Sequence, residues 1–130
     1  MKLGVLNLIF ILIIFFISFS SKSEPIEGNV VEIQILDKIS AKINNIKIKV
    51  NESNNFETLK IDILSCFKNP PEEIPEDFVL LRIHDRINKD LVKLIYQGWM
   101  ISSSPSSTPL EHPIYDLWIK SCKFNDDNNF

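Results

Sequence analysis

The chain has 130 residues, with 14 basic and 17 acidic side chains and a formal net charge of −3. This acidic balance, without basic clusters, argues against nucleic-acid binding and against electrostatic attachment to anionic lipid. Two cysteines are too few for a structural zinc site, and three glycines leave no glycine-rich phosphate loop.

The first 23 residues have the composition of a secretory signal peptide. Lys2 gives a positive start, residues 3–19 are mostly Leu, Ile, Phe and Val, and small residues follow at peptidase spacing, ending at Ser20 or Ser23. We therefore predict export and cleavage, with an uncleaved membrane anchor as the alternative, because the apolar run is at the short limit for a span of about 30 Å. Cleavage after Ser23 removes 23 residues and two of the 14 bases, which leaves 107 residues with 12 bases, 17 acids and a net charge of −5.

Alternating apolar and polar residues follow and predict antiparallel β-strands. Asn44-Asn45 predicts a tight hairpin, because asparagine tolerates positive φ, and residues 51–55 predict a polar loop. The expected strands cover residues 31–35, 39–43, 46–50, 59–63, 79–83, 92–100 and 115–119. About six to seven short strands predict an all-β fold, a small antiparallel sandwich or barrel in one domain at 24–124, with a disordered polar tail at 125–130.

Two irregular segments interrupt the strands, at residues 69–76 and 102–113. Each contains three prolines, which are incompatible with helix and with ladder pairing. Loops on a rigid sheet often carry binding function, although both segments equally suit stiff connectors. The first also holds an acidic group, which is either a solvated loop or a site for a basic partner; it consists of Glu72, Glu73, Glu76 and Asp77.

Cys66 and Cys122 predict one long-range structural disulfide in an exported chain. Simple alternation places both cysteines on the less apolar side of their strands. Trp118 shares the side of Cys122, and Trp99 also falls on a polar side. One interpretation is an aromatic patch formed by both tryptophans over the disulfide, for a ligand or partner protein. The other is that a β-bulge resets the register and both rings lie in the core.

Serines at 102–107, His112 and Asp116 contain the ingredients of a Ser/His/Asp hydrolase. The loop lacks the glycine-bearing elbow that fixes such a nucleophile, so a loop-ordering His112, bonded to a backbone carbonyl or Asp116, is the competing interpretation. A metal site would have to draw on His84, Asp85, Glu111, His112 and Asp116, which lack the spacing of known ligand pairs. We expect no cofactor and favour a non-enzymatic binding or structural module over an envelope hydrolase.

Four ordered blocks, at residues 36–40, 66–73, 98–105 and 110–118 ending at Cys122, resemble a family of small exported alphaproteobacterial proteins catalogued as domain of unknown function 2155. The resemblance covers roughly residues 29–123. It implies a periplasmic location and paired cysteines at 66 and 122, but no established activity, and the partner stays an unknown envelope protein or ligand. The expected binding positions are Trp99, Ser103, Ser104, Glu111, His112, Tyr115, Asp116 and Trp118.

Overall fold

The computed structural model describes residues 2–16 and 23–124. The first range forms helix α1 (Lys2–Phe16). No helix in these two ranges is long and apolar enough to cross a membrane. The expected cleavage after Ser20 and the expected disordered tail at 125–130 lie outside the described residues.

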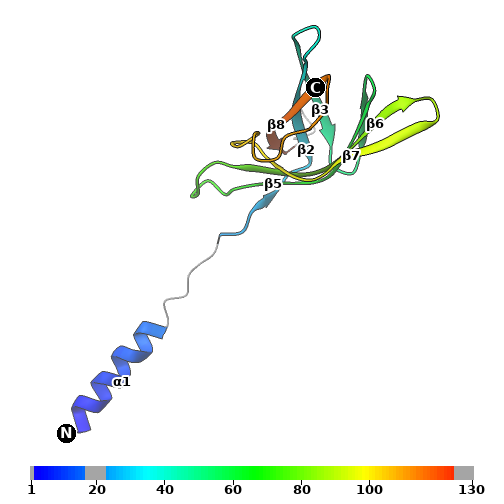
Figure 1. Ribbon diagram of the computed structural model, residues 1–130. Coiled ribbons are helices and arrows are strands. Elements are labelled where there is room, and N and C mark those ends of the chain that lie inside the picture. The colour runs from blue at the N-terminus through cyan, green and yellow to red at the C-terminus, as the bar shows by residue number, and fades with distance from the viewer. Residues whose placement is uncertain (1, 17–22, 125–130) are drawn as a thin grey trace.

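The second range folds into two antiparallel sheets (Figure 1). Sheet A has the order β1-β5-β6-β7. The short strands β1 and β4 share one edge of β5: β4 pairs with its first residues and β1 with its last. Sheet B has the order β3-β2-β8. The strands are β1 (Ile26–Glu27), β2 (Val30–Asp37), β3 (Lys42–Lys49), β4 (Ser53–Phe56), β5 (Leu59–Lys68), β6 (Asp77–Asn88), β7 (Leu91–Ile101) and β8 (Tyr115–Lys123). The predicted all-β antiparallel fold is confirmed, in its sandwich-like rather than its barrel form, with eight strands in the described residues instead of about six to seven.

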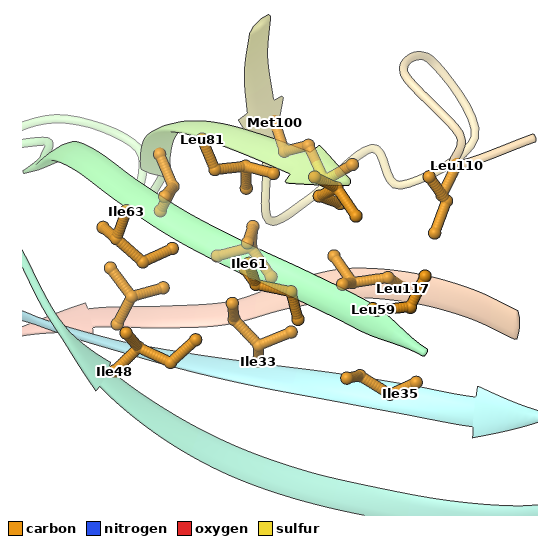
Figure 2. Close-up of a cluster of buried hydrophobic side chains, with 14 of the residues drawn as sticks. Ile33, Ile35, Ile48, Leu59, Ile61, Ile63, Leu81, Met100, Leu110 and Leu117 are labelled. Atoms are coloured by element: carbon orange, nitrogen blue, oxygen red, sulfur yellow. The ribbon is translucent and has the colours of Figure 1, made fainter. Parts of the chain in front are cut away.

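The core lies between the sheets because each strand buries alternate apolar residues. In Figure 2, Ile33 and Ile48 of sheet B approach Ile61 and Ile63 of sheet A. Leu110 adds a side chain from the segment before β8. All residues of this core lie between Val31 and Cys122, and residues 2–14, the part of α1 whose burial is described, are exposed, so the β domain holds its own core.

The two cysteines lie in the core, and the prediction that they face the less apolar side is wrong. A register shift between Ile63 and Ser65 of β5, and another opposite Glu32 and Ile33 that leaves Lys120 of β8 unpaired, reset the alternation. The predicted disulfide is confirmed: Cys66 and Cys122 are 0% and 1% exposed, and their Cα atoms are 5.9 Å apart. The bond joins β5 of sheet A to β8 of sheet B.

The first hairpin turns earlier than predicted. Asn44 and Asn45 lie inside β3, paired with Ile35 and Gln34. The turn uses residues 38–41 instead, because the Asp37 carboxylate accepts hydrogen bonds from the amides of residues 39 and 40 and Ala41 adopts a φ of 54°. The predicted polar loop at 51–55 is also shorter than expected, since Ser53–Phe56 forms β4.

Gly28 connects β1 to β2 against the disulfide. Its amide donates to the Cys66 carbonyl at 3.0 Å. A Cβ atom at this position would lie 2.4 Å from Cys122 Sγ and 2.9 Å from Cys66 Sγ. Only glycine fits this close approach without displacing the disulfide.

Candidate functional site

An apolar depression lies on the outer face of sheet A, the face turned away from the core. It has a volume of about 260 Å³ and is lined by Pro25, Phe67, Phe78 and Trp99, which we call the aromatic patch. Phe67 and Phe78 are directly opposed on β5 and β6, and Trp99 comes from β7 two residue positions further along, in the next row that faces outward. Three adjacent strands and the residue before β1 therefore assemble the patch.

Trp99 is the most prominent side chain of the aromatic patch. The residue is 44% exposed, whereas the next residue, Met100, is 3% exposed and faces the core. The indole packs against Phe67 with ring centroids 6.0 Å apart and an interplanar angle of 40°. Tyr96 Oη donates to the Trp99 carbonyl at 2.9 Å, which anchors the local backbone. Trp99 thus presents a supported, solvent-facing aromatic surface.

Trp118 does not join this surface. It lies on β8 of sheet B, is half-buried, and donates from Nε1 to Gln34 Oε1 at 2.8 Å. Pro105 and Thr108 of the 102–113 segment pack nearby. The two tryptophans therefore belong to different sheets and different surroundings. The interpretation that they share one face is wrong, and so is the alternative that both rings lie in the core, because Trp99 is exposed.

The two proline-containing segments are tied together by Glu76. Its carboxylate accepts from Ser102 Oγ at 2.9 Å, from the Ser103 amide at 3.0 Å, and from Ser103 Oγ. Burial favours the neutral carboxyl, but the hydrogen bonds from Ser103, Ser102 and the Asp77 amide outweigh burial and lower the pKa of Glu76 below its ordinary value. Ser103 is therefore a junction residue, and Ser104 accepts through its carbonyl from Ser107 Oγ at 2.7 Å.

His112 links the two sheets. Its side chain is 5% exposed, and Nδ1 accepts from the amides of Ile114 and Tyr115 at 3.1 and 3.0 Å. The ring proton is therefore on Nε2, which faces Asp85 Oδ2 of β6 at 3.2 Å. The imidazole also stacks on Tyr115, with centroids 5.1 Å apart. Both ring nitrogens are thus used in holding the start of β8.

The remaining predicted site residues near His112 have separate surroundings. Asp116 pairs with Lys38 at 3.1 Å, and Lys38 also donates to the His112 carbonyl at 2.7 Å. Glu111 is exposed. Burial, followed by the carboxylates of Glu57, Asp37 and Asp85, raises the pKa of the Tyr115 hydroxyl.

The predicted alternative of a Ser/His112/Asp116 hydrolase does not match this geometry. Among the described residues, the side-chain partners of His112 are Asp85 and two backbone amides, and none is a serine hydroxyl or Asp116. A base for acyl transfer needs a nucleophile within about 2.6–3.2 Å. Asp85, the carboxylate that His112 does contact, comes from a strand 27 residues away, so local spacing gave no signal for this pair.

Fold and surface together define a disulfide-linked β-sandwich with an exposed aromatic patch. The chain belongs to the family described as uncharacterized proteins conserved in bacteria (DUF2155), which matches residues 31–122. The family resemblance predicted from the sequence is therefore confirmed.

One relative is the uncharacterized protein RP359 of Rickettsia prowazekii (strain Madrid E). It is 38% identical over 88 residues, which is 67% of this chain and 56% of the relative. The chain thus spans little more than half the length of that protein. No solved structure is significantly similar to the chain.

Proposed function

We propose that this protein is exported to the periplasm and acts there as a non-enzymatic module that binds another component of the cell envelope through the aromatic patch. Export rests on the apolar segment at residues 3–19 and the serines that follow it. The Cys66–Cys122 disulfide supports the same location, because such bonds persist in oxidising compartments.

The observation that carries the binding role is the exposure of Trp99 over a supported apolar surface. Apolar side chains on the outer face of a sheet are unfavourably hydrated, so a partner that covers them gains binding free energy. Tryptophan is also among the residues that dominate binding energy at protein interfaces, because it buries a large area with little loss of rotamer freedom. The rest of the fold supports this surface: the core, the disulfide and the His112 contacts all hold the sheets rigid behind it.

Site-specific photo-cross-linking in living cells tests the proposal. A photoreactive amino acid replaces Gln97, which is exposed on β7 two residues before Trp99, and in a matched control replaces Lys47, which is exposed on β3 of sheet B. We expect adducts at position 97 that disappear in a Trp99→Ala variant, and few or none at position 47. Equal adducts at both positions, or adducts that persist without Trp99, would count against a binding role for this face.

Localisation is tested separately by mass spectrometry of fractionated cells. We expect a periplasmic chain whose N-terminus lies after Ser20 or Ser23. Recovery of the chain starting at Met1 from the membrane fraction would show instead that the N-terminal segment is an uncleaved anchor. Either result leaves the cross-linking comparison interpretable, because both positions are in the same domain.

A further inference from the structure

The aromatic patch lies at the end of sheet A where acidic residues are concentrated. Directly opposed residues of an antiparallel sheet project to the same face. Glu27, Phe67, Phe78 and Ile101 form one such row across β1, β5, β6 and β7. An exposed carboxylate at Glu27 therefore stands beside the two phenylalanines of the patch.

The segments next to the aromatic patch add more negative charge. Glu24 directly precedes Pro25, and the connection from Phe67 to Phe78 contains Glu72, Glu73, Glu76 and Asp77 but a single base, Lys68. Glu24, Glu72 and Glu73 are exposed. With Glu27, these three residues form what we call the acidic rim.

Lys68 does not neutralise the acidic rim on the outer face. It is half-buried and belongs to the next row, opposite Ile26 and Asp77, so alternation turns it to the other side of the sheet. Glu76 is already occupied by Ser102 and Ser103. Arg82, which follows Leu80 by two residues on the same face of β6, has its Nε 4.0 Å from the Asp62 carboxylate. The exposed charges on the β1 and 69–76 side of the apolar surface are therefore negative.

We propose that the aromatic patch receives a segment of an envelope protein in which an apolar side chain is flanked by lysine or arginine. This inference rests on the proposed function and specifies its partner. The apolar side chain would cover Trp99 and the phenylalanines, while the flanking cations would meet the acidic rim. Charge complementarity of this kind steers association and excludes partners of like charge. It also disfavours a bilayer as the occupant, because anionic headgroups would face the same carboxylates.

The test uses residues 23–130, because the β domain holds its own core. Three fluorescently labelled, end-blocked peptides share a central leucine–phenylalanine pair, which is flanked by lysines, by serines or by glutamates. Binding is measured by fluorescence anisotropy, and vesicles of phosphatidylethanolamine and phosphatidylglycerol serve as the membrane probe. We expect the lysine-flanked peptide to bind about tenfold or more tightly than the glutamate-flanked one at low salt. The difference should shrink at 1 M salt, where the Debye length is about 3 Å.

Matched variants separate the apolar and electrostatic contributions. Trp99→Ala should weaken binding of the lysine-flanked peptide by at least about tenfold, and Trp118→Phe on sheet B should leave it unchanged. Glu27→Lys should weaken the same peptide about threefold to tenfold. Glu52→Lys makes the same charge change in the exposed turn after β3 and should have no such effect.

Each contrary result overturns the inference in a distinguishable way. Equal affinities for the lysine- and glutamate-flanked peptides, with binding still lost in Trp99→Ala, would remove the cationic requirement and leave the binding module intact. Adsorption to vesicles without peptide binding would mean that the aromatic patch binds a membrane surface and not a protein segment. Failure of all peptides and vesicles to bind would overturn the partner assignment, and the cross-linking comparison at position 97 would then decide the binding function on its own.

Discussion

Substitution of Gly28 by alanine should destabilise the domain specifically through the disulfide. The added Cβ would lie 2.4 Å from Cys122 Sγ, 2.9 Å from Cys66 Sγ and 3.0 Å from the Lys123 carbonyl oxygen. The optimal van der Waals separation of non-bonded heavy atoms is about 3.5–4.0 Å. Both sulfur atoms are buried in the core and cannot swing away as a flexible side chain would. Overpacking at such a site costs about 1–3 kcal/mol.

A double-mutant cycle isolates the contribution of the sulfur atoms. Gly28→Ala is made in the wild-type chain and in a Cys66→Ala/Cys122→Ala background, which itself should lose about 4 kcal/mol because the bond closes a loop with a sequence separation of 56. Without the sulfurs, the two closest contacts of the added Cβ are removed, and the Lys123 carbonyl oxygen at 3.0 Å stays. The alanine also reduces the entropy of the unfolded chain, so its net cost should fall below about 1 kcal/mol.

Urea unfolding of the four proteins, followed by circular dichroism, gives the free energies of unfolding. The expected result is that Gly28→Ala costs about 1–2 kcal/mol less in the Cys66→Ala/Cys122→Ala background than in the wild-type chain. An equal cost of Gly28→Ala in both backgrounds would refute the reasoning, because the penalty would then come from the backbone or from Lys123 rather than from the sulfur atoms.

Three further predictions follow from contacts described above. His112→Ala should lower the free energy of unfolding by about 2–3 kcal/mol, because the two amides that donate to Nδ1 lose their acceptor. Glu111→Ala, at the exposed neighbouring residue, is the control and should cost about 0.5 kcal/mol or less. An equally small cost for His112→Ala would contradict this role. Glu76→Gln should cost about 1–2 kcal/mol at neutral pH. The pKa of Glu76 is lowered in the fold from 4.5, so the stability that its carboxylate contributes is present above pH 4.5 and declines as the pH falls through the folded pKa. The free energies of unfolding of the two proteins should therefore converge in acid. A difference that persists in acid would count against this role of the Glu76 carboxylate. Trp99→Ala should cost about 1 kcal/mol or less in thermal unfolding, because the ring is 44% exposed; a loss of 3–5 kcal/mol would mark it as a core residue.

The strands could be predicted from the sequence because alternation reports directly on a half-buried sheet. Ile33 and Ile35, for example, have the burial that their spacing predicts. Local turn chemistry was less informative: Asn44-Asn45 has the composition of a hairpin turn, yet pairing along β2 kept both residues in a strand and Asp37 stabilised the turn instead. A single unpaired residue in a strand also reverses the face of the sheet predicted for every residue after it. Lys120 of β8 has this effect on Cys122.

The candidate site was predicted in part, because its members come from distant segments. The exposure of Trp99 follows from alternation within its own strand. Its neighbours Phe67 and Phe78 depend on the pairing of β5, β6 and β7, for which the sequence has no local signal. The interpretation of His112 as a loop-ordering residue expected a backbone carbonyl or Asp116 as its partner. Its side-chain partner is Asp85, which lies 27 residues away on β6, so spacing along the chain could not indicate this contact.

The link between His112 and Asp85 has a consequence for how the two sheets separate. It lies at the end of the sandwich near Leu59 and Tyr115, whereas the disulfide lies at the other end of β5 and β8, seven residues along each strand or about 23 Å away. One end is closed by a covalent bond and the other by hydrogen bonds, so thermal opening should begin at His112 and rotate about the disulfide as a hinge. Amide hydrogen exchange should therefore be faster at the start of β8 than at its end, so the two sheets separate preferentially from the His112 end.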